Sequence, residues 1–263
     1  MLPKRVPFKN FSPDEHETWT ILFAIQAKKR DEQIIPEFSH GLKVLGFTSD
    51  RVPDLDAINN RLRALTGWQG VAVEGFEEFD SFYEMLANKQ FPIGNFMRDR
   101  TDLSYTPAPD VFHDLYGHIP FYATPEYAHF NYDFGRRAMR YKGNTKILRE
   151  FERLYWFSME FALINTPDGR RIFGAGIASS HKECAYALSP EPEVVPFDLE
   201  VIRNQEFRID ILQPRLFCLE NREQLYNCLD DFERPYRQQI PKWDVAHTLS
   251  HNDTRLPYFN APS

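Results

Sequence analysis

A single carboxylate, Glu160, lies within the apolar stretch "LYWFSMEFALI" of residues 154–164. The stretch contains no Gly or Pro and predicts a helix, on which positions three and four residues from Glu160 share its face. Those positions are all apolar: Trp156, Phe157, Leu163 and Ile164. Burying an unpaired carboxylate costs several kcal/mol, so Glu160 must be protonated, paired with a cation or bound to a metal.

Composition limits the partners and the compartment of the chain. Its 263 residues suffice for one large domain or two small ones, and 42% hydrophobic residues support a substantial core. The net charge of -7 argues against nucleic acid or an anionic membrane as partner. No apolar stretch is long enough to span a bilayer, and the N-terminus lacks the apolar run of a secretory signal. Three cysteines without zinc spacing indicate a reduced, cytoplasmic compartment.

The pattern of apolar and turn residues predicts a single, mainly α domain with small β pieces. Residues 1–12 are expected to form a loose arm and residues 237–263 a loop-like tail. The segment 70–76 is the best strand candidate, 91–98 should be extended, and 190–220 is rich in proline and strand signals. The expected helices cover 12–33, 35–46, 52–68, 81–90, 125–141, 145–164 and 221–236.

A second group of possible ligands lies in "PDVFHDLYGHIP", where His113 and His118 flank Asp114. On a regular α-helix two residues five apart point about 140° away from each other. Pro120 disfavours helical geometry at the residue before it, so His118 can lie at a distorted helix end and approach His113. Two imidazoles and a distant carboxylate such as Glu160 have the composition of the facial triad that holds non-haem Fe(II).

Other interpretations of these residues remain open on spacing alone. An isolated pair of histidines five residues apart is a weak motif. Glu160 would also be satisfied as the salt-bridge partner of a buried arginine. A zinc hydrolase would use the same ligands together with a base that activates water.

Three segments in order carry a resemblance to a known family: "YTPAPDVFHDLYGHIPFYATPEYAHF", "LYWFSMEFALI" and "FGAGIASSHKE". The chain resembles the pterin-dependent aromatic amino acid hydroxylases from about Thr18 to Phe232, and especially their bacterial, phenylalanine-specific members. The resemblance implies the single-domain catalytic fold of that family. It also implies a non-haem Fe(II), tetrahydropterin-dependent monooxygenase that converts L-phenylalanine to L-tyrosine with O₂.

The resemblance also implies roles for individual residues. The two histidines and the glutamate that bind iron in the family correspond to His113, His118 and Glu160. The aromatic ring that stacks on the pterin corresponds to Phe82. Asp114 occupies a position near the pterin where the family usually has Glu.

The amino-acid pocket of the family is matched residue by residue in the same way. Arg98 corresponds to the arginine that receives the substrate carboxylate, and Asp110 to the acid that holds this arginine. A guanidinium suits bidentate carboxylate binding. Trp156 corresponds to a residue that packs on the substrate ring. The other pocket positions implied are Thr106, Gly176 and Ser179.

Substrate and assembly are expectations of the same kind. Trp156 fills space that tryptophan-specific members leave open, and Cys218, largely apolar in behaviour, stands where tyrosine-specific members have Asp. Trp156 therefore disfavours tryptophan 5-hydroxylation and Cys218 disfavours tyrosine 3-hydroxylation, so phenylalanine is the expected substrate. Hydroxylation of phenylalanine at position 3 and a non-catalytic relative are the remaining alternatives. The chain has room for neither the regulatory domain nor the tetramerisation helix of the mammalian members, and its tail shows no heptads, so we expect a monomer.

Overall fold

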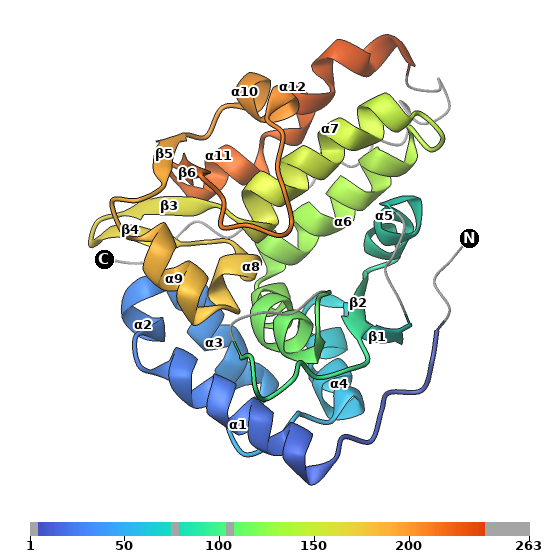
Figure 1. Cartoon of the computed structure of the whole chain (residues 1–263). Coiled ribbons are helices and arrows are strands. Elements are labelled where there is room, and N and C mark those ends of the chain that lie inside the picture. Colours follow the sequence, from blue (N-terminus) through green and yellow to red (C-terminus); the bar gives the residue numbers. More distant parts are fainter. Residues whose placement is uncertain (1–4, 75–78, 104–107, 240–263) are drawn as a thin grey trace, which may run out of the picture.

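The computed structural model describes residues 5–74, 79–103 and 108–239, and most of them are helical (Figure 1). The predicted fold class, mainly α with small β pieces, is confirmed. The α-helices are α1 Pro13–Ala27, α2 Arg30–Gln33, α3 Pro36–Leu45, α4 Leu55–Thr66, α5 Phe79–Ala87, α6 Pro125–Met139, α7 Thr145–Tyr155, α8 Ala175–Ala178, α9 His181–Ala187, α10 Leu199–Asn204, α11 Arg222–Tyr226 and α12 Leu229–Glu233. Two π-helices, η1 Phe112–His118 and η3 Trp156–Glu160, and two 3₁₀-helices, η2 Ile119–Ala123 and η4 Arg234–Gln239, complete the helical elements.

Two small sheets accompany the helices in the described part of the chain. Strands β1 Gln69–Val73 and β2 Gln90–Gly94 pair in parallel, with α5 between them in the chain. The second sheet has the order β4-β3-β6-β5, built from β3 Leu163–Thr166, β4 Gly169–Ile172, β5 Glu193–Pro196 and β6 Arg215–Leu219. In this sheet β3 is antiparallel to β4 and parallel to β6.

The first helix begins as its sequence predicts but ends early. Ser12 caps α1, accepting a hydrogen bond from the Glu15 amide while the Glu15 carboxylate accepts one from the Ser12 amide. The expected helix over 12–33 is interrupted after α1, because Lys29 has non-helical angles of φ -132° and ψ 3°. After the short helix α2, the Ile35 amide donates a hydrogen bond to Ile172 O of β4. This pairing with the second sheet ends the helix before residue 35.

The expected helix over 145–164 is correct only as far as Glu160. Phe161 leaves the helix with φ -129° and ψ 22°, and Leu163 and Ile164 belong to β3. Both side chains are fully buried, and a short apolar run satisfies a buried strand as well as a helix. Pairing of Leu163 with Cys218 of β6 decides in favour of the strand.

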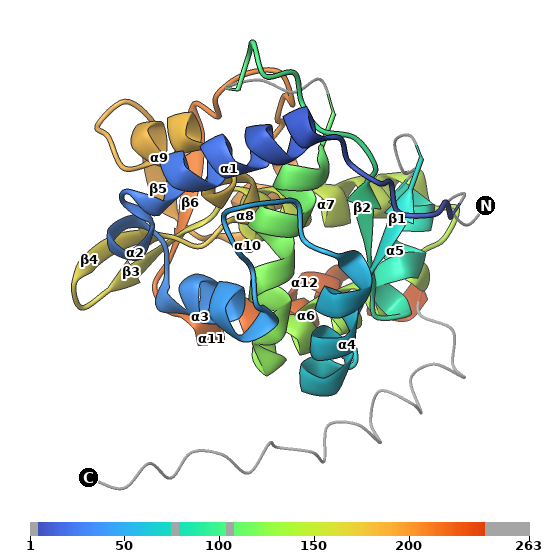
Figure 2. The same ribbon diagram turned by 90° about the horizontal axis from the view of Figure 1, so that it is seen from below.

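The core lies between the N-terminal helices, which are in front in Figure 2, and the α6–α7 pair, which run side by side in Figure 1. Phe134 of α6 meets Phe151 of α7 edge to face, with ring centroids 5.3 Å apart. On the opposite side Trp19 of α1 packs on Phe112 of η1 at 5.0 Å. The first π-helix is therefore enclosed by aromatic packing. Within the described residues, none of the helices has both the length and the apolar character needed to span a membrane.

A buried ion-pair network holds the C-terminal part against α6. The carboxylate of Glu233, 2% exposed, accepts hydrogen bonds from Arg137 Nη1 (2.7 Å), Arg140 Nη1 (2.9 Å) and Tyr141 Oη (3.1 Å). Breaking a buried pair by removing one partner leaves an uncompensated charge.

We therefore expect Glu233→Ala to lower the free energy of unfolding by about 3–5 kcal/mol. Urea denaturation followed by circular dichroism measures this. Asp230→Ala is the matched control, because Asp230 also bonds Arg137 but its side chain is 56% exposed; its loss should cost about 1 kcal/mol or less. Equal losses in the two variants would contradict the assigned role of burial.

Candidate metal centre

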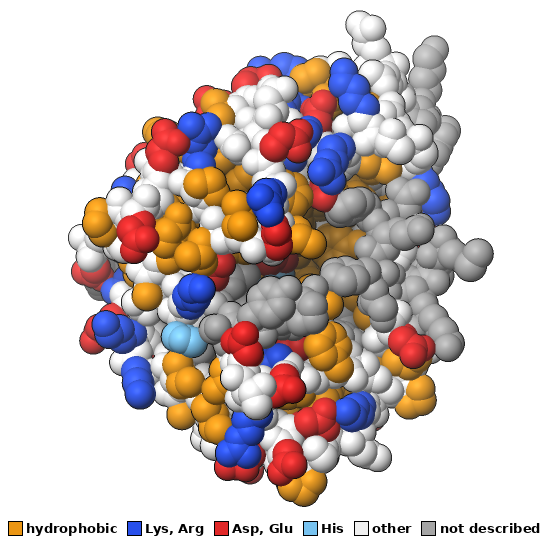
Figure 3. Space-filling model, viewed as in Figure 1, with side chains coloured by type: hydrophobic (Ala, Val, Ile, Leu, Met, Phe, Trp, Pro, Cys, Tyr) orange, Lys and Arg blue, Asp and Glu red, His pale blue; other side chains and the backbone are white. Residues whose placement is uncertain are grey.

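A cavity of about 780 Å³ opens between β2, α5, η1 and the continuous helical segment formed by α7 and η3. In Figure 3 hydrophobic side chains line the hollow near the centre of the face. Aromatic rings dominate this lining: Phe82, Phe91, Phe96, Tyr155, Trp156 and Phe207. Such a cavity, apolar with a few converging polar groups, is typical of small-molecule sites.

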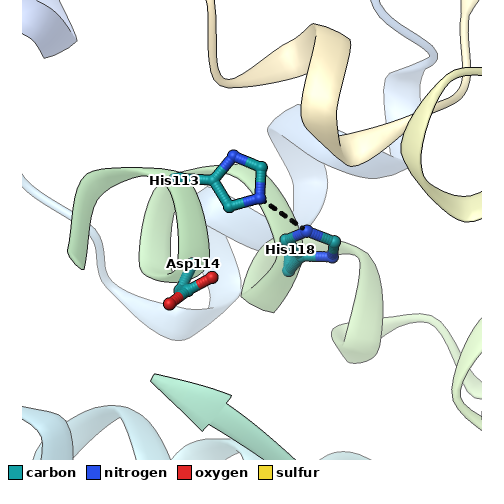
Figure 4. Close-up of side chains that lie close together, drawn as sticks. All are labelled: His113, Asp114 and His118. Atoms are coloured by element: carbon teal, nitrogen blue, oxygen red, sulfur yellow. Dashed lines mark hydrogen bonds between the residues drawn. The ribbon is translucent and has the colours of Figure 1, made fainter. Parts of the chain in front are cut away.

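The two histidines reach the cavity from a π-helix. In η1 the backbone closes with hydrogen bonds between residues five apart, so His113 and His118 lie on one side of the helix. Figure 4 shows the two imidazoles facing each other, with Nε2 atoms 3.2 Å apart. The expected distortion thus extends through the whole segment rather than only its end. This geometry explains how a spacing unsuited to an α-helix brings both rings together.

Glu160 approaches the same point from the end of the second π-helix, η3. Its Oε1 lies 3.1 Å from His118 Nε2, and its Oε2 lies 3.8 Å from His113 Nε2. Nitrogen and oxygen ligands about 2.0–2.2 Å from an ion, at adjacent corners of its coordination sphere, lie about 3 Å apart. Two imidazole nitrogens and one carboxylate at these separations therefore fit one metal ion and leave the cavity side open.

The protonation of His113 is fixed by a hydroxyl group. Ser179 Oγ donates to Gly176 O at 2.9 Å, so its oxygen accepts from His113 Nδ1 at 3.0 Å. The Nδ1–H tautomer leaves the Nε2 lone pair free toward the cavity. Burial, together with the neighbouring His118, lowers the pKa of His113 to about 4. His113 is therefore neutral, the form that binds metals.

The carboxylate of Glu160 is ionised although it is largely buried. Burial by itself raises its pKa, but the neighbouring His118 and His113 imidazoles and the Gly176 amide hold the pKa below its usual value. Gly174 and Gly176, at the start of α8, lie very close to Glu160. A Cβ on Gly176 would lie 2.8 Å from Glu160 Oε2, and one on Gly174 would lie 2.2 Å from Glu160 O. Only residues without a side chain allow this approach.

We expect Gly176→Ala to weaken Fe(II) binding at least about tenfold, because the added methyl group displaces the Glu160 carboxylate. Titration of the metal-free protein with Fe(II) under anaerobic conditions measures the change. Gly70→Ala is the control: its Cβ would also be crowded, at 3.0 Å from Ile93 Cγ1, but it lies in β1 away from the ligands. An unchanged Fe(II) affinity in Gly176→Ala would show that Gly176 is not needed to position the Glu160 carboxylate.

Asp114 is a competing candidate for the third ligand. Ligand atoms of His113, Asp114 and His118 lie within 4.8 Å of one another. However, Asp114 Oδ2 already accepts from the Gly94 amide at 2.6 Å, and Figure 4 shows its carboxylate set apart from the facing imidazoles. Burial raises the pKa of Asp114 to about 7. The shorter distances favour Glu160 as the third ligand, with Asp114 beside the centre.

Arg98 and Asp110 form a buried pair next to the first histidine. The Asp110 carboxylate accepts from Arg98 Nε and Nη2, both at 2.8 Å, and from the His113 amide at 2.9 Å. Burial opposes ionisation of Asp110, but the Arg98 guanidinium holds its pKa below the usual value. Asp110 thus connects the arginine to the start of η1.

The structure brings together only part of the predicted pocket. Phe82, Asp114 and Trp156 line the cavity, whereas Gly176 and Ser179 contact the candidate ligands and Arg98 and Asp110 lie beside them. Thr106 lies outside the described residues. Cys218 lies in strand β6, with its Sγ 3.4 Å from Asn165 Oδ1, and is not part of the described cavity wall, so its effect on substrate choice stays a prediction.

Among the cavity residues that were not singled out from the sequence are Arg149, Glu152 and Phe207. Phe207 stacks on Trp156 with ring centroids 4.3 Å apart. Glu152 precedes Trp156 by four residues and Glu160 by eight. Counting back along the helix in steps of four residues from Glu160 and Trp156 would therefore have indicated Glu152 from the sequence.

Two histidines and one carboxylate that converge on one side of a cavity are typical of mononuclear non-haem iron oxygenases. Comparison with known proteins identifies the group more closely. Residues 2–247 match the model of the biopterin-dependent aromatic amino acid hydroxylases. The chain therefore belongs to this family.

Individual relatives agree with that assignment. The phenylalanine-4-hydroxylase of Chromobacterium violaceum is 41% identical over 234 residues, which cover 88% of this chain and 78% of the relative. Its structure with iron and phenylalanine bound has a TM-score of 0.82 at 38% identity, covering 90% of this chain and 87% of the other. Its structure with iron(III) and 7,8-dihydrobiopterin has the same score and identity, covering 90% and 88%.

Proposed function

We propose that the protein is a phenylalanine 4-monooxygenase that uses Fe(II), a tetrahydropterin and O₂ to convert L-phenylalanine to L-tyrosine. The observation that carries the proposal is the convergence of His113, His118 and Glu160 on one point of an aromatic cavity. The relatives named for this reaction support the choice of substrate. Bound iron and tetrahydropterin would together supply the reduction of O₂ that leads to ring hydroxylation.

The chain's own residues would hold and orient the reactants. His113, His118 and Glu160 would bind the metal, with Ser179 and Gly176 fixing the orientation of two of these ligands. The aromatic lining of the cavity would exclude water and keep the reactants in contact.

Arg98 would receive the carboxylate of the amino acid. A guanidinium has five N–H donors, and the described residues accept from three of those on Arg98: Nε and Nη2 donate to Asp110, and Nη1 donates to Leu103 O at 3.1 Å. The other N–H on each Nη has no acceptor among the described residues, and these two form a pair that can bind a carboxylate at two points. Thr106 is retained as a proposed pocket residue on the resemblance alone.

The two aromatic reactants would use different walls of the cavity. Phe82, which packs edge to face on Tyr155 at 5.0 Å, would stack on the pterin, with Asp114 nearby. Trp156 would contact the substrate ring. One face of Trp156 is covered by Phe207, which fixes the plane of the indole and favours a six-membered ring over a second indole.

Oxygen uptake and product chromatography test the proposal. The Fe(II) protein is incubated with tetrahydropterin, O₂ and L-phenylalanine, L-tyrosine or L-tryptophan in turn. We expect para-tyrosine, with kcat/KM for phenylalanine at least about tenfold above that for tryptophan, a gap of about 1.4 kcal/mol. If meta-tyrosine, DOPA or 5-hydroxytryptophan is the main product, the proposed substrate or ring position is wrong, but the proposed metal centre stands. Absence of any product would leave a non-catalytic relative.

We also propose that residues 1–263 act as one catalytic domain and as a monomer in the cytoplasm. Three free, buried cysteines suit a reducing compartment. Light scattering at micromolar concentration should give a mass near the 31.0 kDa of the chain. A stable tetramer under these conditions would contradict the monomer.

A further inference from the structure

An ion pair inside the cavity has no role in the proposed reaction. Arg149 and Glu152 both line the cavity, and Arg149 Nη1 lies 2.5 Å from Glu152 Oε2. The two side chains differ in exposure, at 45% for Arg149 and 10% for Glu152. Glu152 therefore lies within the cavity wall, and Arg149 stands at the opening.

The position of Glu152 relative to the metal centre follows from the helix. Glu152, Trp156 and Glu160 are spaced by four residues and share one face of the α7–η3 segment, so all three line the cavity. Eight residues of helix place Glu152 roughly 10–12 Å along the axis from Glu160. Tyr155, three residues after Glu152, packs edge to face against the Phe82 ring. Glu152 thus lies beyond the aromatic wall, on the side of the opening.

The Glu152 carboxylate has an acceptor that the described residues leave unused. Arg149 bonds to Oε2, and no described residue donates to Oε1. Burial raises the pKa of Glu152, while the Arg149 guanidinium opposes that shift. An acceptor that faces the cavity and takes no hydrogen bond from the described residues can gain one from a donor brought by the ligand.

We propose that Glu152, oriented by Arg149, determines which pterin the cavity accepts, by taking hydrogen bonds from hydroxyl groups on the pterin side chain. This inference rests on the proposed function. A pterin ring near the metal centre and Phe82 would direct its side chain toward the opening, where this carboxylate is a charged acceptor in the wall. A neutral, hydroxylated chain fits best, because the carboxylate disfavours an anionic chain and Arg149 is already paired.

Binding measurements on the anaerobic Fe(II) protein test the inference without turnover. Calorimetry compares 7,8-dihydrobiopterin, whose side chain carries two hydroxyl groups, with 6-methyl-7,8-dihydropterin, which has none. Wild type should bind the hydroxylated compound at least about tenfold more tightly, the usual effect of a hydrogen bond to a charged group. Glu152→Ala should lose most of this preference, while its affinity for the methyl compound changes less than about twofold.

Glu206→Ala is the matched control. Glu206 is near enough to influence the Glu152 pKa, but its side chain is 70% exposed, it pairs with Arg153, and it is not part of the cavity wall. This variant should keep the wild-type preference.

Two outcomes would overturn the inference alone: wild type showing no preference between the compounds, or Glu152→Ala weakening both equally. A raised KM for phenylalanine in Glu152→Ala, with pterin binding unchanged, would instead assign Glu152 to the amino acid and also overturn it. Failure of wild type to bind either pterin would overturn the proposed function as well, so the two failures are distinguishable.

Discussion

Glu160→Ala is expected to lose most of the bound iron and nearly all turnover. Substituting a residue that only supports a ligand already costs about 10–100-fold in metal affinity, so removing the ligand itself should cost more than about 100-fold. The variant would leave two imidazole nitrogens 3.2 Å apart without the carboxylate charge that balances a dication. Titration with Co(II), followed by its visible absorption, measures affinity independently of activity.

Asp114→Ala is the matched comparison for this prediction. Its ligand atoms lie in the same cluster as those of His113 and His118, but its carboxylate bonds the Gly94 amide. We expect this variant to retain metal with less than about a tenfold loss of affinity. The assignment of the third ligand is reversed if Asp114→Ala loses the metal and Glu160→Ala keeps it.

Arg98→Ala should raise KM for phenylalanine by roughly 30-fold or more, since a buried pair between guanidinium and carboxylate is worth about 2–5 kcal/mol when one partner is removed. It should also destabilise the protein, because Asp110 is fully buried and would keep a charge without its partner, at about 3–5 kcal/mol. Steady-state kinetics and urea denaturation measure the two effects separately.

A double variant, Arg98→Met with Asp110→Asn, separates binding from stability. The amide oxygen can still accept from the His113 amide, and no charge is left unpaired, so most of the stability should return. KM should remain high because the two free N–H donors are gone. Recovery of KM would show that the carboxylate binds elsewhere. Asp110→Ala alone should also weaken the metal centre, since Asp110 holds the start of η1, so its effect is not simply a milder form of Arg98→Ala.

Local signals in the sequence predicted most helices but not the point at which the helix expected over 145–164 gives way to a strand. Ser12 and Gly46 act at helix ends as their residue types predict. The end at Glu160 was missed because the apolar residues that follow it suit a helix and a buried strand equally. Pairing of β3 with β4 and β6 is a contact between distant segments, and periodicity does not reveal it.

The candidate site was predictable in its residue types and less so in its contacts. Resemblance brought His113, His118 and Glu160 together, and their distances are compatible with that expectation. The same resemblance described Gly176 and Ser179 as pocket positions, whereas here they support Glu160 and His113. Such support depends on gaps of a few tenths of an ångström, which no pattern of residue types encodes.

The π-helical turn between His113 and His118 also bears on how such sites are recognised and how they diverge. A π-turn holds one residue more than an α-turn, so a pair five apart in η1 faces the same way as a pair four apart in an ordinary helix. A motif search restricted to H-x-x-x-H would overlook this arrangement. In evolutionary terms, one inserted codon is enough to change a four-residue spacing between two histidines into a five-residue spacing. The helical turns on either side can keep their positions, while the residues between the histidines point in new directions.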